Sequence, residues 1–215
     1  MNHKPKLELT WIGKDQQPKL EPRILIEDPE KSYGDKNTEN MLIYGDNLLA
    51  LRALEQDFAG KIKCIYIDPP FNTGNAFEHY DDSLEHSIWL TLIRDRLKLL
   101  RKLLKRDGCI IVHIDDEEAH YLKVLMDEIF ERRNFITSIA VKSSTPSGLK
   151  TTSKNKTIIK TKDHLLIYKA SDDLKITPQY VKRDKWDSHY SKYYDRENDI
   201  ILDLISVLIK ENILP

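Results

Sequence analysis

Residues 61–74 read KIKCIYIDPPFNTG, and the rest of the chain is best understood from this stretch. Its first half, Ile62–Ile67, is a short run of apolar and β-branched residues, which predicts a buried strand. The run ends at an acid, two prolines and an aromatic residue, Asp68-Pro69-Pro70-Phe71. Open α/β sheets bind their ligands just outside the carboxyl ends of their strands. The stretch therefore predicts a strand that brings Asp68 and its neighbours to a ligand site.

The composition narrows the class of protein. The 215 residues are 40% hydrophobic and 32% charged, with a formal net charge of −1, which suits a globular protein without an overall basic field. Cys64 and Cys109 lie inside apolar runs, so we expect both to be reduced and buried. No Cys/His cluster has the spacing of metal ligands. Because we find neither a signal peptide nor a run of about 20 apolar residues, we expect a cytoplasmic protein that does not span a membrane.

Apolar runs along the chain predict alternating strands and helices. Helical apolar faces contain Leu48–Leu54, Ile88–Leu104 and Leu122–Phe130, and strands are predicted at 41–44, 62–67, 109–114, 135–141 and 164–168. This order predicts an α/β fold with a mostly parallel, helix-covered sheet. We expect residues 1–40 to form an N-terminal arm, either extended or partly disordered. We expect residues 41–170 to form the domain that contains this sheet, and residues 171–215 to follow it, with an apolar, helix-like tail at Ile200–Leu214.

The apolar stripe at Ile88–Leu104 predicts one long helix. Glu85 belongs to a pattern that resembles a capping box, and Gly108 is expected to end the helix in the left-handed conformation. Trp89 lies on the apolar stripe and is interpreted as core. Arg94 and the other basic residues of this segment are interpreted as its solvated face.

Polar residues after the predicted strands are candidates for the site. Asp46 is expected to cap the following helix, although an acid at a strand end can also bind a ligand. The acids Asp115–Glu118 have capping-box spacing and are explained mainly by the next helix. His113 is interpreted as a packed core histidine. Seven lysines and one acid lie within Lys142–Lys169, which form either a solvated loop or a contact for phosphate groups.

The chemistry of Asp68-Pro69-Pro70-Phe71 matches one kind of ligand. The prolines stiffen the loop and leave its carbonyls as acceptors, and Asp68 adds an anionic acceptor. Two acceptors beside an aromatic ring suit a planar heterocycle with an exocyclic amino group. Asp68 and the Pro69 carbonyl would take its two hydrogens while Phe71 stacks on the ring, which makes the nitrogen a better nucleophile.

The segment IDPPFNTG closely resembles motif four, (D/N/S)PP(Y/F/W), of amino-methyltransferases acting on DNA. Its flanks, including GDNLLALRALEQ, GCIIVHIDDEEAHYLKVLMDEIF and DHLLIYKAS, resemble modification subunits of type III restriction systems. These are β-class adenine methyltransferases, and the resemblance runs from about Leu9 to Tyr168. It implies a partial class I, Rossmann-like methyltransferase fold that lacks the strands of the glycine-rich cofactor motif. Residues 41–170 would be the catalytic, target-base half of the methyltransferase domain, and residues 171–215 the vestigial start of its target-recognition region. The resemblance also implies double-stranded DNA as substrate, a restriction subunit as a possible partner and S-adenosylmethionine as methyl donor.

The resemblance also assigns roles to individual residues. Asp68, Pro69, Pro70 and Phe71 would be catalytic and hold an adenine that has flipped out of the duplex. The amine would then attack the donor methyl group directly, without a cysteine nucleophile. Asp46 would line the adenosine side of the donor. Asn72 and Lys142, which lie outside the tetrapeptide, are the expected substrate-binding residues.

Two features depart from the family pattern. Phe71 stands where these subunits usually carry tyrosine, which keeps stacking and loses a hydroxyl. The glycine-rich cofactor motif, FxGSGTT, does not occur in the chain. Its strand lies beside the Asp-Pro-Pro-Phe strand in the family, so we expect one edge of Ile62–Ile67 to be bare. We therefore expect a truncated methyltransferase, inactive alone, whose partner is a complementary fragment.

Two other functions remain open from the sequence. The chain can be a non-catalytic remnant that binds DNA or a partner subunit through its basic loop and aromatic tail. It can also belong to a methyltransferase that acts on the amine of cytosine, or on RNA or protein. The tetrapeptide serves both adenine and cytosine amines, so the choice of adenine depends on the flanking resemblance.

Overall fold

The computed structural model describes residues 7–16, 21–35, 37–72, 76–77, 80–81, 85–145, 160–178 and 191–213. The chain divides into two compact units, Met1–Lys175 and Ile176–Pro215. The first unit contains a four-stranded sheet with the order β1 (Ile62–Ile67), β4 (Leu104–Ile114), β6 (Lys162–Lys169), β5 (Phe135–Lys142). Its helices are α1 (Asn47–Phe58), α2 (His86–Leu103) and α3 (Ala119–Phe130), with a 3₁₀ turn, η1 (Arg132–Asn134), and a short hairpin of β2 (Ala76–Phe77) and β3 (Tyr80–Asp81). No described helix is long and apolar enough to cross a membrane.

The strand directions follow from the connections between strands. β1 and β4 pair in parallel, whereas β6 is antiparallel to both β4 and β5. Three of the four strands, β1, β4 and β5, therefore run the same way, as expected when α2 and α3 connect consecutive strands. The predicted α/β fold is confirmed, with the addition that β6 returns antiparallel between β4 and β5.

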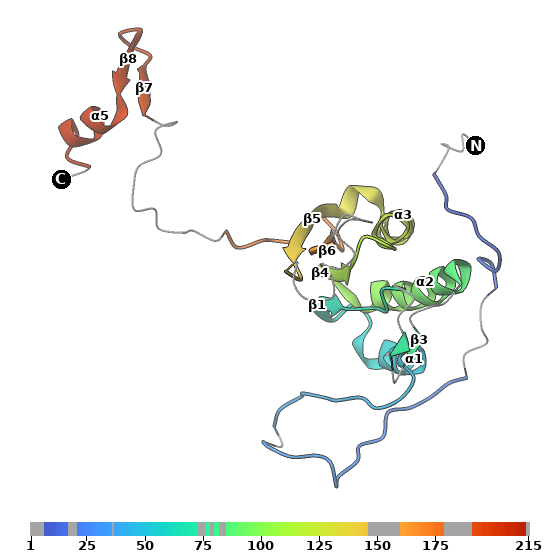
Figure 1. Cartoon of the computed structure of the whole chain (residues 1–215). Coiled ribbons are helices and arrows are strands. Elements are labelled where there is room, and N and C mark those ends of the chain that lie inside the picture. The colour runs from blue at the N-terminus through green and yellow to red at the C-terminus, as the bar shows by residue number, and fades with distance from the viewer. Residues whose placement is uncertain are drawn as a thin grey trace, which may run out of the picture. The chain divides into compact units, whose positions relative to one another are not determined.

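The helices α2 and α3 pack on one face of this sheet (Figure 1). The buried residues of β4 alternate along the strand, which is the pattern of a strand with one covered face. We call this side the covered face; its sheet residues include Ile65, Ile110, Val112, Leu166 and Tyr168. Trp89, Leu97, Leu122 and Phe130 contribute the facing helix residues, and none of them is exposed.

The opposite side of the sheet is much less protected. We call it the open face; it presents Cys64, Tyr66, Cys109, Ile111 and His113, which alternate with the covered residues of β1 and β4. Cys64 is exposed and Cys109 half-buried, and both are free cysteines. The prediction that both are buried was therefore wrong. An apolar run shows that a strand is buried somewhere, but not that both of its faces are.

The outer edge of β1 is unpaired among the described strands, as predicted. The predicted strand at 41–44 is wrong, because this segment makes no ladder with β1 or any other described strand. Leu42 and Tyr44 are 100% and 103% exposed. A strand needs a paired neighbour to be stable, and apolar composition alone does not provide one.

Three predicted boundaries also require correction. α2 ends at Leu103, and β4 begins at Leu104 instead of Cys109. Gly108 lies inside β4 at an irregularity in the pairing with β1, where a Cβ would lie 2.9 Å from the carbonyl oxygen of Lys63. Glycine is therefore required there by close backbone approach, and not as a helix cap. In the second unit, the predicted helical tail at Ile200–Leu214 is helical only in α5 (Leu204–Lys210). Its first residues form β8 (Ile200–Asp203), which pairs with β7 (Lys192–Asp195).

Part of the N-terminal arm lies on the outer surface of α2 and α3. The Trp11 indole donates to the hydroxyl of Thr91 at 2.8 Å, and Lys14 contacts Glu128 at 2.8 Å. Arg94 is only 1% exposed and donates to the carbonyl of Gln16 and to Asp95. Its assignment to the solvated face was therefore wrong, because the arm covers it.

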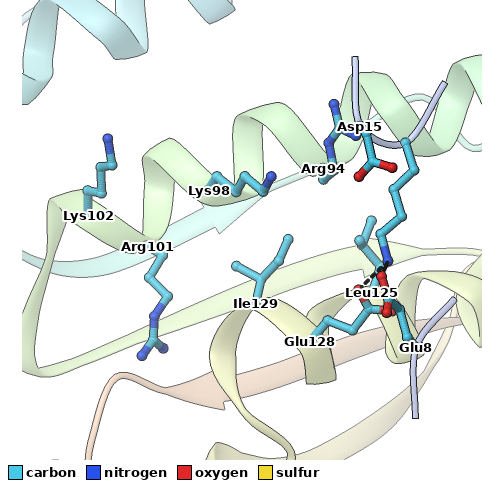
Figure 2. A pocket seen from close by; sticks show the side chains of 10 residues that line it. Glu8, Asp15, Arg94, Lys98, Arg101, Lys102, Leu125, Glu128 and Ile129 are labelled. Carbon is cyan, nitrogen blue, oxygen red and sulfur yellow. Dashed lines mark hydrogen bonds and ion pairs between the residues drawn. The ribbon is translucent and has the colours of Figure 1, made fainter. Parts of the chain in front are cut away.

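A pocket of about 480 Å³ lies beside this arm, between α2 and α3. Figure 2 shows Lys98, Arg101 and Lys102 along α2, opposite Glu128 and Ile129 of α3. The lining of this pocket includes no residue of the Asp68–Phe71 loop. Among its lining residues, Lys14 pairs with Glu8 and with Glu128, and the Glu128 pair attaches the arm to α3.

Candidate functional site

Asp68 follows β1 directly, at the carboxyl end of the parallel pair of strands. Its side chain is 59% exposed and therefore open to a ligand. The next residues, Pro69, Pro70, Phe71 and Asn72, are all half-buried. The predicted position of this loop at a strand end is what the structure shows, and it combines an accessible acid with a partly covered aromatic ring.

The covered face holds this loop in place. The indole nitrogen of Trp89, a fully buried residue of α2, donates to the carbonyl oxygen of Pro70 at 2.8 Å. The Pro70 carbonyl is therefore already used, whereas that of Pro69 has no such contact among the described residues. Trp89 was assigned to the core, which is correct, but its hydrogen bond to the loop has no signature in the sequence.

Asn72 ends the described part of the loop in an unusual backbone conformation. Its φ is 57°, in the left-handed region that asparagine tolerates better than most residues. Its side-chain amide donates to Glu118 Oε1 at 2.8 Å. This bond ties the loop to the start of α3. The predicted substrate contact through Asn72 remains a prediction, and its amide group also has this anchoring contact.

Glu118 is the buried acid beneath the loop. Only 4% of it is exposed, and its Oε1 also lies 2.9 Å from Nδ1 of His86. The predicted capping box of Asp115 and Glu118 was wrong, because Glu118 makes no side-chain bond to cap α3. Asp115 instead accepts from the backbone amide of Glu117, and burial raises the pKa of the Asp115 carboxyl group. Glu118 therefore anchors the loop, a role that the sequence did not indicate.

His113 lies beside Asp68 and is not a core histidine. Its Nδ1 is 3.4 Å from Asp68 Oδ1, and its Nε2 is 3.2 Å from Asp163 Oδ2. Its ring meets the ring of Phe71 edge-on, with centroids 5.2 Å apart. One signal was present in the sequence: His113 alternates with Ile110, Val112 and Ile114 and is therefore out of phase with the core.

Acids after β4 meet lysines before and within β6. Asp116 Oδ1 lies 2.6 Å from Lys162 Nζ and 2.7 Å from His164 Nε2, and Lys160 pairs with Glu117. Hydrogen bonds from Lys162 and then His164 lower the pKa of Asp116 to about 2. The acids are thus more than helix caps, and two lysines of the predicted basic loop are paired. Its residues 146–159 lie outside the described part of the chain.

Other predicted site residues lie apart from these contacts. Asp46 caps α1 as expected, accepting from the amides of Leu48 and Leu49 at 2.9 and 3.1 Å. Its carboxylate also lies 3.9 Å from Arg96. Lys142 is exposed at the end of β5, opposite Lys162. Within the described ranges, no group of three His, Cys, Asp or Glu residues is arranged to hold a metal ion.

Known proteins resemble this chain in sequence. It is 43% identical over 145 residues to a protein named as the probable type III restriction-modification enzyme HindVI Mod subunit of Haemophilus influenzae, covering 67% of this chain and 19% of that protein. It is 32% identical over 208 residues to the EcoPI Mod subunit of Escherichia phage P1, covering 80% and 31%. The chain thus spans between a fifth and a third of the length of these relatives.

Solved structures give a weaker comparison. A complex of M1.HpyAVI with S-adenosylmethionine has a TM-score of 0.45 and 14% identity, covering 66% of this chain and 58% of that one. The cytosine-N4-specific PvuII DNA methyltransferase has a TM-score of 0.41 and 20% identity, covering 61% and 49%. These values are too low to support an argument about function.

The match to a protein family covers most of the region described above. The sequence pattern of the DNA methylase family matches residues 62–204, which include the Asp68 loop, His113, Glu118 and Asp163. This range is more than half of the chain. The protein belongs to the DNA methylase family.

Proposed function

We propose that this chain carries the target-base half of a DNA methyltransferase, which holds the exocyclic amine of a flipped adenine for methylation. Its substrate is double-stranded DNA in the cytoplasm, and it serves the modification part of a restriction-modification system, as the Mod subunit relatives suggest. A restriction subunit is its further proposed partner. The observation that carries this proposal is the accessible Asp68 carboxylate on a loop that Trp89 and Glu118 hold from below.

Each residue of the loop has a separate part in this proposal. Asp68 accepts one hydrogen of the amine, and the carbonyl of Pro69 accepts the other. Pro70 fixes the loop, because its own carbonyl is used by Trp89. Phe71 offers a ring for stacking, and base–aromatic stacking contributes about 1–3 kcal/mol per base. Withdrawing both hydrogens toward acceptors increases electron density on the nitrogen, which favours attack on a methyl group.

S-adenosylmethionine is the methyl donor of this family, but the residues described here do not fit it. Asp46, the predicted donor contact, uses its carboxylate to cap α1. The sequence contains no FxGSGTT motif, and the β1 edge beside which that motif belongs is unpaired among the described strands. We therefore propose that the residues described here serve the base and not the methyl donor.

Binding of the exocyclic amino group is tested with small ligands and the purified 215-residue chain. In ¹H–¹⁵N spectra, 9-methyladenine is expected to shift the amide resonances of Ile67, Phe71 and Asn72, with a Kd on the order of 1 mM, equivalent to about −4 kcal/mol. The matched control ligand is 9-methyl-6-(dimethylamino)purine, which keeps the ring and lacks both amine hydrogens. Asp68→Ala is expected to abolish the shifts.

Several outcomes would count against this function. Equal shifts from the dimethylamino compound would mean that the amine is not recognised. Shifts that survive in Asp68→Ala would remove Asp68 from the site. Tighter binding of 1-methylcytosine than of 9-methyladenine would transfer the proposal to cytosine. Transfer of a labelled methyl group to duplex DNA by the purified 215-residue chain would show that these residues also bind the donor, and would overturn their assignment to the base alone.

A further inference from the structure

The position of His113 follows from the register of the sheet. Ile67 of β1 is paired with Val112 of β4, so the residues that come next, Asp68 and His113, are neighbours across the two strands. On the other side, His113 is paired with Leu165 of β6, and Asp163 comes two residues earlier on that strand. The pairing therefore places the imidazole of His113 between the carboxylates of Asp68 and Asp163, which are 95 residues apart in sequence.

The two carboxylates differ in their surroundings. The side chain of Asp163 is 13% exposed and that of Asp68 is 59% exposed. Asp163 makes a hydrogen bond with Nε2 of His113, which fixes the orientation of the ring. With the ring fixed, Nδ1 points to Asp68, the acid that is free to meet a ligand. A carboxylate that orients a histidine through one nitrogen while the other acts is a recurrent arrangement in enzyme sites.

The imidazole also supports the aromatic part of the site. Its ring meets Phe71 at an interplanar angle of 80°, an edge-to-face arrangement that aromatic rings prefer. One side chain thus contacts both the acid and the ring that are proposed to hold the base. The side chain of His113 is 22% exposed and lies on the open face, so it contributes little to the core.

We propose that His113 is a positioning residue for the base site, with its Nδ1 holding the Asp68 carboxylate and Asp163 orienting its ring through Nε2. The consequence for base binding rests on the proposed function. The contact between His113 and Asp68 is a property of the chain itself. The two parts can therefore be tested separately.

The first test measures the contact between His113 and Asp68 in the chain without any ligand. In long-range ¹H–¹⁵N spectra of the chain labelled at histidine, Asp68→Asn is expected to shift Nδ1 of His113, and Asp163→Asn is expected to shift Nε2. His164, whose Nε2 contacts Asp116, serves as the internal control and should not respond to Asp68→Asn. If Asp68→Asn leaves Nδ1 of His113 unchanged, the proposal is overturned.

The second test replaces one ring nitrogen of His113 at a time with an amide nitrogen. In asparagine, the side-chain amide nitrogen can occupy the place of Nδ1, whereas in glutamine it can reach the place of Nε2. His113→Asn is therefore expected to bind 9-methyladenine within about threefold of the wild type, and His113→Gln and His113→Ala about tenfold more weakly, a difference of about 1.4 kcal/mol. A merely structural histidine would not separate asparagine from glutamine in this order.

The outcomes distinguish this inference from the proposed function. If the wild-type chain does not bind 9-methyladenine but Asp68→Asn shifts Nδ1, the proposed function fails and the role of His113 in holding Asp68 stands. If the chain binds 9-methyladenine and His113→Asn binds as weakly as His113→Ala, the positioning role is wrong. Thermal unfolding of each variant, followed by circular dichroism, confirms that the affinities are compared between folded chains.

Discussion

The two faces of the same sheet differ in how they are protected. On the covered face, Ile110 is 0% exposed and packs beneath α2 and α3. On the open face, Tyr66 is 56% exposed, and Cys64 is exposed beside it. Both faces carry apolar residues, yet only one is buried by the described helices. The covered face therefore contains the hydrophobic core of the unit, while the open face carries His113, the residue proposed to position Asp68.

The site lies where the two faces meet. Trp89 and Glu118 reach the loop from the helical side, whereas His113 reaches Asp68 from the open side. The loop therefore has a rigid support below and a polar partner beside it. Such a division is expected of a site whose geometry is fixed by buried residues while its reactive groups remain accessible.

The difference between the two faces can be tested with the same substitution at two adjacent residues of β4. Ile110→Ala removes side-chain volume from the covered face and is expected to lower the free energy of unfolding by about 3 kcal/mol, since it leaves a cavity. Ile111→Ala, on the half-buried open face, is expected to cost about 1 kcal/mol or less. Urea unfolding of both variants provides the measurement. Equal losses would mean that the open face is as well packed as the covered one.

Periodicity in the sequence was enough to identify most elements of the first unit. Ile62–Ile67, the stripe of α2 and the stripe of α3 all have the predicted type, because burial of one face imposes the period on the residues. The prediction of a strand at 41–44 was wrong because a strand needs a partner to pair with, and local composition does not show whether a partner is present. The prediction that both cysteines are buried was wrong for a related reason, since periodicity does not show which residues pack against each face of a strand.

The candidate site could be predicted only in part. The Asp68–Phe71 loop was found because two prolines after a strand are a local signal. His113 and Asp163 were not recognised as its neighbours, because register between β1, β4 and β6 brings them there. Glu118 was assigned to a helix cap from its spacing, although it lies under Asn72. Contacts between distant segments are decided by tertiary packing, which short sequence patterns do not contain.

A smaller loss of stability is expected from a substitution of Trp89, the residue of α2 that supports the loop. Trp89→Phe keeps a large buried ring but removes the donor to the Pro70 carbonyl, leaving that oxygen without its partner. We expect a loss of about 1–2 kcal/mol in the free energy of unfolding. Amide exchange at Phe71 and Asn72 should become faster, as followed by hydrogen exchange and NMR.

Trp11→Phe is the matched control for that experiment. It removes a similar indole donor, to Thr91, from the N-terminal arm and not from the loop. Its unfolding free energy is expected to fall by less, because Trp11 is only half-buried, and amide exchange at Phe71 should not change. Faster exchange at Phe71 in both variants would show that global stability, and not the Trp89 bond, controls the loop.

The smallest effect concerns the two thiols of the open face, which lie 4.0 Å apart on β1 and β4. Burial and then the neighbouring Cys64 raise the pKa of the Cys109 thiol. A raised pKa leaves less thiolate at a given pH, and the thiolate is the nucleophile. Iodoacetamide is therefore expected to modify Cys64 faster than Cys109 near pH 7.5, with the difference narrowing as the pH rises.

The substitution Cys64→Ser separates the two causes of this difference. It removes the neighbouring thiol but not the burial of Cys109, so the pKa of Cys109 should fall and its alkylation should become somewhat faster, as measured by mass spectrometry. If both thiols react slowly and at the same rate in the wild-type chain, the open face is covered in solution. Asp68 and His113 would then not be accessible to a ligand from that side of the sheet.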